Sequence, residues 1–214
     1  MLKAVKILTS LVLVSWAGHA RGQVAEKVVD ISTRPRVSQR MLVLSPKTAK
    51  AAAVLLAGGH GGLQISADGS FGWGKGNFLV RSRQLFVDHG LLVAVVDAPS
   101  DRQSPPYLSG FRGTSEHVMD LKAVIAWLRQ QANVPVWLIG TSRGTQSAAY
   151  AATYLAGRDG ADGLVLTSTI LTDSREFPVP ALQLDRVRIP VLVVHHVNDG
   201  CNHCRYADIS KANE

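Results

Sequence analysis

Ser142 is the residue of this sequence best placed to act as a nucleophile. It is the middle residue of the motif GTSRG, residues 140–144, which follows an apolar run and precedes an alanine-rich one. At a strand-to-helix junction such a serine lies on a tight turn, where flanking glycines relieve crowding and the hydroxyl stands above the sheet. The main-chain N–H of Arg143 would then help to bind a developing oxyanion. The alternative is a serine that caps the next helix, but a cap needs no glycine on either side.

The segment AGGHGG, residues 57–62, is the best source of a second oxyanion donor. It follows a short apolar run, and its glycines allow the main chain to turn amides toward the serine. We expect the donor to be the N–H of Gly59 or of His60. Two nucleotide-binding patterns fail here. The dinucleotide fingerprint G-x-G-x-x-G would require a glycine at position 64, where this chain has Gln64. Residues 69–76 nearly match a phosphate-binding loop, but Gly76 stands where that motif requires a hydroxyl residue.

Asp199 is the candidate for the acid that orients a catalytic base. It follows the apolar segment of residues 189–195, and nucleophile, acid and histidine occur in this order along the chain in enzymes whose serine lies on such a turn. Asn198, Asp199 and Gly200 also form a good turn sequence, so a purely structural role for Asp199 is the competing interpretation.

The elements around these residues alternate between strands and helices. Residues 24–44 predict two antiparallel strands joined at Pro35. Apolar residues at helical spacing predict helices at residues 77–88, 115–131 and 145–156. Continuous apolar runs predict strands at residues 52–57, 91–96, 134–139, 164–167 and 189–195. Such strands, separated by helices, indicate an α/β fold with a mostly parallel central sheet and helices on both faces.

The chain resembles the α/β-hydrolase superfamily, and within it the compact serine hydrolases similar to dienelactone hydrolase. The resemblance covers residues 52–214 and rests on the GTSRG motif, the AGGHGG loop and the segment HHVNDGC after a late strand. It implies hydrolysis of an ester or related acyl bond in a small-molecule substrate, with Ser142 as nucleophile, Asp199 as the acid and no cofactor. Two positions depart from the usual pattern. Ala57 stands where many relatives carry histidine, and Arg143 stands where Met, Gln or Leu is more usual, so its charge bears on substrate choice.

A catalytic base for Ser142 is the missing part of this hypothesis. The chain has 15 residues after Asp199, whereas a further helix, strand and loop need about 25. The ending RYADISKANE predicts the first turns of a helix. We therefore expect a hydrolase without its last helix and strand, with activity impaired because the catalytic histidine is absent. His60 is the first alternative base because its loop must approach the serine, while His89 and His117 are expected to be solvated.

Residues 1–22 have the order of a secretory signal peptide, with two lysines, an apolar run over residues 7–16 and then small residues. The run is too short to cross a bilayer, which needs about 20 residues. We expect a single α/β-hydrolase domain over residues 23–214 and a periplasmic or secreted protein with no stable membrane span. The net charge of +7 includes three charges of this leader. The remaining basic residues are scattered, which argues against nucleic-acid binding.

Residues 195–204 carry histidines, cysteines and an aspartate, and they offer a different hypothesis. The CNHC motif has the C-x-x-C spacing of zinc sites and redox pairs, so a metal-binding or redox protein is an alternative. Zinc would prefer a second cluster, and the sequence has no other cysteine, so we assign no metal ligands. Because a C-x-x-C pair closes a tight ring, we expect a free thiol at Cys201 or Cys204. A non-catalytic binding protein of the same fold is the third possibility.

Overall fold

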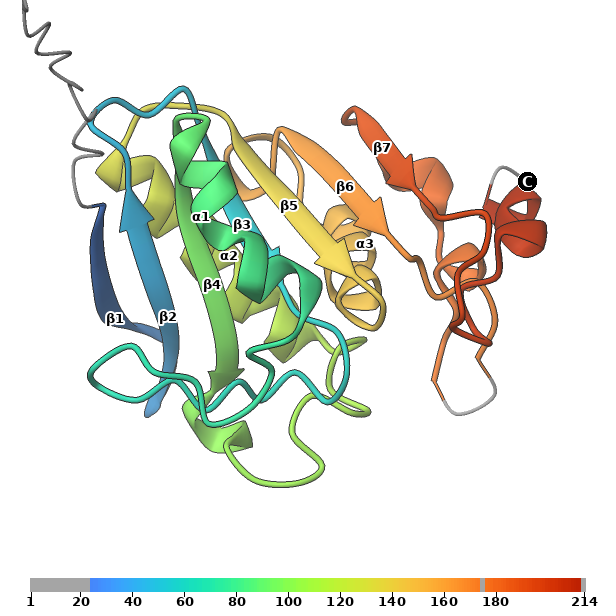
Figure 1. The fold of residues 1–214 in the computed structure, drawn as a ribbon, viewed down its shortest axis with the longest axis horizontal. Coiled ribbons are helices and arrows are strands. Elements are labelled where there is room, and N and C mark those ends of the chain that lie inside the picture. Colours follow the sequence, from blue (N-terminus) through green and yellow to red (C-terminus); the bar gives the residue numbers. More distant parts are fainter. Residues whose placement is uncertain (1–23, 174–175, 213–214) are drawn as a thin grey trace, which may run out of the picture.

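The computed structural model describes residues 24–173 and 176–212, so the predicted signal peptide lies outside the described residues. These residues form one seven-stranded sheet with helices on both faces (Figure 1). The strands are β1 (Ala25–Arg34), β2 (Val37–Ser45), β3 (Ala51–Leu56), β4 (Leu91–Pro99), β5 (Val136–Thr141), β6 (Gly163–Thr167) and β7 (Val191–Val194). The α-helices are α1 (Phe78–Asp88), α2 (Ser115–Gln131) and α3 (Gly144–Tyr154). Short 3₁₀-helices occupy Ser100–Arg102, Gly157–Asp159, Val179–Ala181, Leu184–Arg186 and Tyr206–Ala212.

The parallel strands place the glycine loop and the serine motif at the same end of the sheet. β1 and β2 form the expected antiparallel hairpin, and the spatial order is β1-β2-β4-β3-β5-β6-β7. β2 pairs with β4 in antiparallel fashion, whereas all pairs from β4 to β7 are parallel. In the pairing of β3 with β5, Leu56 lies opposite Gly140. The glycine loop after β3 and the serine motif after β5 therefore leave the sheet side by side, at the carboxyl ends where open α/β sheets bind ligands.

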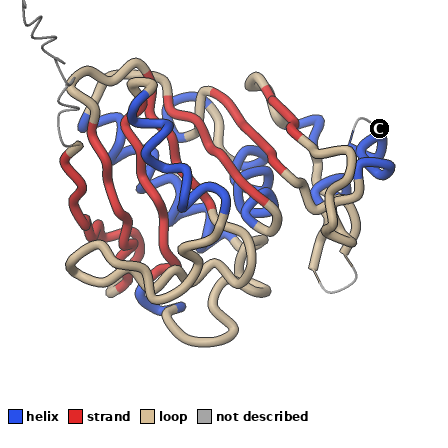
Figure 2. Tube along the Cα trace, in the orientation of Figure 1, coloured by secondary structure: helices blue, strands red, loops and turns tan. Residues whose placement is uncertain are grey.

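Two apolar layers hold the helices to the sheet. Met41 and Val43 of β2 belong to the core beneath α2 and α3, whereas Leu42 and Leu44 belong to the core beneath α1. This alternation is the two-residue period of a strand with both faces buried. Figure 2 shows α1 on one face of the sheet and α2 and α3 on the other. The predicted α/β fold with a mostly parallel sheet is confirmed.

Two predicted elements differ from those observed. Tyr206–Ala212 forms a 3₁₀-helix rather than the first turns of an α-helix. β7 has four residues and is shorter than predicted, because Pro190 has no N–H for the ladder and His195 turns to bond the loop after β6. Among the described residues, the structure contains no helix with the length and apolarity needed to cross a membrane.

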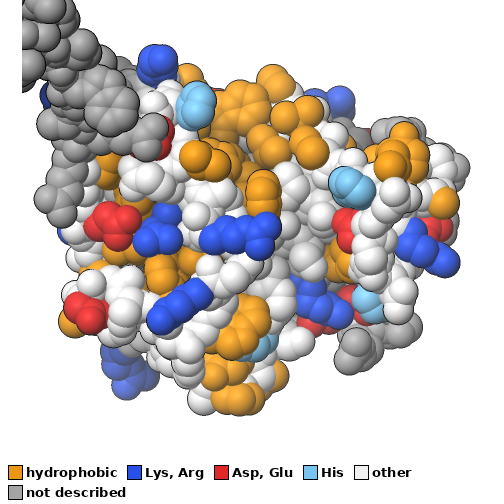
Figure 3. Space-filling view, viewed as in Figure 1, with side chains coloured by type: hydrophobic (Ala, Val, Ile, Leu, Met, Phe, Trp, Pro, Cys, Tyr) orange, Lys and Arg blue, Asp and Glu red, His pale blue; other side chains and the backbone are white. Residues whose placement is uncertain are grey.

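The region around β7 is the least covered part of the sheet. Val191, Leu192 and Val194 are about half exposed. A groove of about 790 Å³ on the α1 face is lined by side chains that include Phe78, Val165 and Leu192. Hydrophobic side chains gather at the surface on this face (Figure 3). An open strand edge and an apolar groove of this size are surfaces suited to contact with further protein.

Candidate active site

Ser142 occupies a strained turn between β5 and α3. Its φ angle is 51°, in the left-handed region that non-glycine residues rarely adopt. Its main-chain N–H donates to the carbonyl oxygen of Thr167 over 3.0 Å. Its own carbonyl accepts from the N–H and hydroxyl of Thr145, over 2.9 and 2.6 Å. These bonds hold the turn that the GTSRG motif predicts and leave the serine side chain half-buried at the end of the sheet.

The two glycines of the motif are required by close packing. A Cβ atom on Gly140 would lie 2.5 Å from the carbonyl oxygen of Gly144, and a Cβ atom on Gly144 would lie 2.0 Å from the carbonyl oxygen of Leu56. Such distances are far inside van der Waals contact. The turn can therefore pass between β3 and α3 only where side chains are absent, as in a nucleophile elbow.

The glycine loop after β3 faces Ser142 directly. A Cβ atom on Gly58 would lie 2.9 Å from the Cβ atom of Ser142 and 3.4 Å from its Oγ atom. Gly59 has a φ angle of 62°, and a Cβ atom there would lie 2.4 Å from the ring of Trp73. Glycine is required at these two positions because Ser142 packs closely against the backbone of Gly58 and the ring of Trp73 against that of Gly59, which leaves no room for a side chain.

Three main-chain amides beside Ser142 are free to bind an oxyanion. Within residues 24–173 and 176–212, the structure shows no acceptor for the N–H groups of Gly59, His60 and Arg143. Successive amides that pass through a left-handed residue form a concave anion site, and Gly59 provides that residue. Both predicted oxyanion candidates of the loop therefore remain, together with the amide of Arg143.

The ring of His60 lies between two aromatic side chains. It is tilted by 36° to the ring of Trp73 and stacked on that of Tyr107, with centroid distances of 3.9 and 4.2 Å. Its Nδ1 atom accepts the N–H of Gly62 over 3.1 Å, so the proton of the neutral ring lies on Nε2. Burial lowers the pKa of His60, the nearby charge of Arg112 lowers it further, and Asp97 opposes both. A neutral ring with its proton on Nε2 has no free lone pair with which to take a proton from Ser142.

Two buried charged residues that the sequence analysis missed hold the glycine loop. The carboxylate of Asp97, at the end of β4, accepts N–H groups from Leu63, Gln64 and Ile65 over 2.6, 3.1 and 2.8 Å. Arg112 donates to the carbonyl oxygens of Ala57 and Gly59. Asp97 comes directly after the predicted strand of residues 91–96, a position that could have marked it, but no signal in the sequence indicates Arg112.

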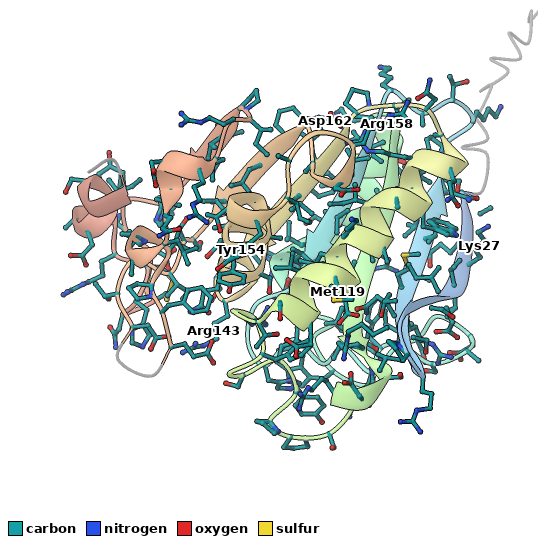
Figure 4. The ribbon with its side chains drawn as sticks, turned by 180° about the vertical axis from the view of Figure 1, so that it is seen from behind. Lys27, Met119, Arg143, Tyr154, Arg158 and Asp162 are labelled. Atoms are coloured by element: carbon teal, nitrogen blue, oxygen red, sulfur yellow. A yellow bond between two sulfur atoms is a disulfide. The ribbon has the colours of Figure 1, made fainter. Side chains whose placement is uncertain are left out.

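The charge of Arg143 is compensated within the site. Its guanidinium lies 2.8 Å from a carboxylate oxygen of Asp173 and 3.4 Å from one of Glu176. It lines a pocket of about 300 Å³ together with Gly59, His60, Ser109 and Glu176. Figure 4 shows Arg143 where the parallel strands end. The two acidic residues belong to the loop after β6, so Arg143 fixes this loop next to the serine.

Asp199 lies in the turn after β7, and β6 separates β7 from β5, the strand that leads to Ser142. The Oδ1 atom of Asp199 accepts the N–H of Cys201 over 2.9 Å, which is the turn role that competed with the catalytic one. The nearby His195 is anchored, since its Nε2 atom accepts the N–H of Thr169 over 2.8 Å. Burial lowers the pKa of His195, whereas the main chain of Cys204 and the charge of Asp199 raise it.

The C-terminal cysteines do not leave a free thiol. Cys201 and Cys204 form a disulfide, so the expectation of a free thiol is wrong. The N–H of Cys204 donates to the carbonyl oxygen of Cys201 over 3.0 Å, and this turn brings the two Cα atoms to 5.1 Å, well within disulfide range. Within the described part of the chain, no group of three or more potential ligands is arranged to hold a metal ion.

His117 is buried, contrary to the expectation that it is solvated. It is 2% exposed in α2, with its ring edge-on to that of Phe111 at 5.4 Å. Burial, together with the nearby charges of Arg112 and Arg34, lowers the pKa of His117 to about 3. Among the described residues, no histidine forms a hydrogen bond with the hydroxyl of Ser142. The described residues therefore bring together the serine and the candidate oxyanion amides, with no histidine bonded to the serine hydroxyl.

Comparisons with known proteins identify the fold. No family model and no curated protein sequence matches the chain. An esterase from Pyrococcus furiosus is similar at a TM-score of 0.64 and 14% identity, over 89% of this chain and 76% of that one. A cold-adapted esterase from an Arctic intertidal metagenomic library gives a TM-score of 0.57 and 15% identity, over 89% and 83%. The acylaminoacyl peptidase of Pyrococcus horikoshii gives 0.60 and 13%, over 89% and 35%. At these identities the likeness is one of architecture, and the chain has the α/β-hydrolase fold.

Proposed function

We propose that the protein is a serine hydrolase that acts on a carboxylic ester or a related acyl bond. The observation that carries this proposal is the strained conformation of Ser142, held at the end of the central sheet beside the glycine loop. Such strained backbone conformations occur mainly at functional sites. The names of two of the similar structures, both esterases, support the same reaction class.

The proposed chemistry is nucleophilic acyl transfer to water. Ser142 Oγ attacks the substrate carbonyl carbon, and its proton passes to a base. The amide of Arg143, together with that of Gly59 or His60, binds the negative oxygen of the tetrahedral intermediate. The intermediate collapses, the alcohol leaves with a proton, and water then releases the acid from the serine. Asp199 is proposed to orient the base.

We further propose that the base is a histidine outside these 214 residues. His60 carries its proton on the nitrogen that would have to accept one, and His195 is committed to the main chain of Thr169. A further helix and strand would pack on the open edge of β7 and in the apolar groove beside it. Together they would bring such a histidine to Asp199. Gene sequence beyond codon 214 should encode that helix, strand and loop histidine. A gene that ends at that codon, with full activity in its product, would contradict this proposal.

Hydrolysis of p-nitrophenyl acetate tests the proposed reaction. The wild-type rate should exceed the rate in buffer, and Ser142→Ala should remove the excess. Ser168→Ala is the matched control, because Ser168 also follows a strand and has a left-handed φ of 45° but lines the apolar groove beside β7. An equal rate for the wild type and Ser142→Ala would overturn the proposal.

Export is proposed from the leader sequence. Mass spectrometry of the protein recovered from its native host should show a mature N-terminus near Arg21 or Gln23 if the protein is periplasmic or secreted. An intact N-terminus on the mature protein would place it elsewhere.

A further inference from the structure

Arg112 is a buried cation without a directly paired anion. It is 1% exposed, and among the described residues no carboxylate lies within ion-pair distance of its guanidinium. Its hydrogen bonds go instead to the hydroxyl of Ser147 over 2.7 Å and to the carbonyl oxygens of Gly59 and Ala57 over 3.2 and 3.4 Å. Burying a charge without a paired anion destabilises the folded protein. Buried charges of this kind are found mainly at functional sites, where the charge takes part in the function.

The three acceptors connect both halves of the proposed oxyanion hole. Ala57 and Gly59 belong to the loop after β3, which supplies one amide donor. Ser147 belongs to α3, whose start supplies the other donor at Arg143. One rigid guanidinium therefore fixes the distance between the loop and the helix.

The bonds of Arg112 also determine which way the loop amides face. In a planar trans peptide unit the C=O and N–H groups point in opposite directions. Because the carbonyl of Gly59 points at Arg112, the N–H of His60 must point away from it. A left-handed φ, such as that of Gly59, brings neighbouring main-chain N–H groups to one concave side. We therefore expect the N–H of Gly59 to lie beside that of His60, on the side of the loop away from the guanidinium.

We propose that Arg112 is the positioning residue of the oxyanion hole: it holds the amides of Gly59 and His60 toward the substrate carbonyl oxygen, and its charge stabilises the oxyanion that forms there. This inference rests on the proposed function. A buried positive charge close to developing negative charge acts in a low dielectric, where its effect is large. The charge also explains why an arginine, rather than a neutral donor, occupies this buried position.

The test compares Arg112→Met and Arg112→Lys with the wild type in ester hydrolysis, with Ser142→Ala defining the rate that depends on the serine. Arg112→Met should lower kcat at least tenfold, an order-of-magnitude expectation for losing one oxyanion donor or more, while KM stays within about threefold. Arg112→Lys should recover part of kcat because it keeps the charge. Arg129→Met is the control, since Arg129 also donates to a main-chain carbonyl, that of Gly160, at the far end of α2.

The backbone amide ¹H–¹⁵N shifts of Gly59 and His60 provide a readout that does not need activity. They should change in Arg112→Met and not in Arg129→Met. If the wild type shows no rate that depends on Ser142, the proposed function fails, and these shifts alone decide the positioning role. Unchanged shifts in a folded Arg112→Met protein, or a change in KM with kcat intact, would overturn the inference.

Discussion

The carboxyl ends of β3 and β5 are built far more tightly than those of β6 and β7. In the first region, backbone contacts exclude any side chain at Gly140 and Gly144, and two buried charges fix the adjoining loop. In the second region, Leu192 and Val194 are half exposed, and the segments that follow form only 3₁₀-helices and turns. The proposed nucleophile and oxyanion hole lie in the first region, whereas the proposed acid lies in the second. Half of the proposed site is therefore closely packed and held by buried hydrogen bonds, whereas the half proposed to hold the base is open.

The largest effect should come from filling the space inside the tight region. Gly144→Ala places a methyl group 2.0 Å from the carbonyl oxygen of Leu56, so β3 and α3 must move apart. We expect a loss of at least about 3 kcal/mol in the free energy of unfolding, measured by urea denaturation. Gly200→Ala is the control in the open region, where no atom lies within 4 Å of the added Cβ. Equal stability of the two variants would show that the regions do not differ in packing.

A somewhat smaller effect is expected at the carboxylate that fixes the loop. Asp97→Asn replaces one carboxylate oxygen by an NH₂ group, so either the N–H of Ile65 or the N–H groups of Leu63 and Gln64 lose their acceptor. The loss should be about 2–3 kcal/mol, with faster proteolysis of the loop. Asp68→Asn is the matched control, because this exposed carboxylate accepts the amide of Ser70 within a local turn. Comparable losses from both variants would contradict the role given to Asp97.

Acid should lower the free energy of unfolding through His117, which is buried in α2. The unfolded chain takes up a proton at this residue below pH 6.5, its ordinary pKa, whereas the pKa of about 3 keeps the buried ring neutral in the folded protein. Stability is therefore lost as the pH falls through 6.5, by about 1.4 kcal/mol per unit. Between pH 7.5 and pH 5.5, His117→Phe should lose about 1.4 kcal/mol less than the wild type. Parallel unfolding curves for the two proteins against pH would show that His117 is not buried in its neutral form.

The smallest change in stability is expected in the open region. Leu192→Lys alters a side chain that is 54% exposed, so the free energy of unfolding should change by less than about 0.5 kcal/mol. Sedimentation velocity should show less self-association, because the charge interrupts the apolar edge. Leu164→Ala, in the neighbouring strand and 1% exposed, should instead cost about 2–5 kcal/mol. A large loss of stability in Leu192→Lys would mean that this edge is packed in solution.

The sequence predicts the elements that depend on local periodicity and the motifs that depend on local turns. The three α-helices, the hairpin and the approach of the glycine loop to Ser142 follow from apolar spacing and from glycines next to strand ends. The buried charges could not be predicted in the same way, because their partners are distant in sequence: Asp97 is 34 residues from Leu63 and Arg112 is 53 from Gly59. The burial of His117 likewise depends on tertiary packing that the helical pattern does not specify.

Labelling with a fluorophosphonate tests the central claim most directly, namely that Ser142 is a nucleophile beside a preformed oxyanion hole. The reagent forms a covalent adduct with an activated serine, and peptide mapping by mass spectrometry identifies the residue. In the active form of the protein, which has its catalytic base, we predict a single adduct on Ser142 that is absent in Ser142→Ala and unchanged in Ser168→Ala. Equal labelling of Ser142→Ala, or an adduct mapped to another residue, would contradict the account.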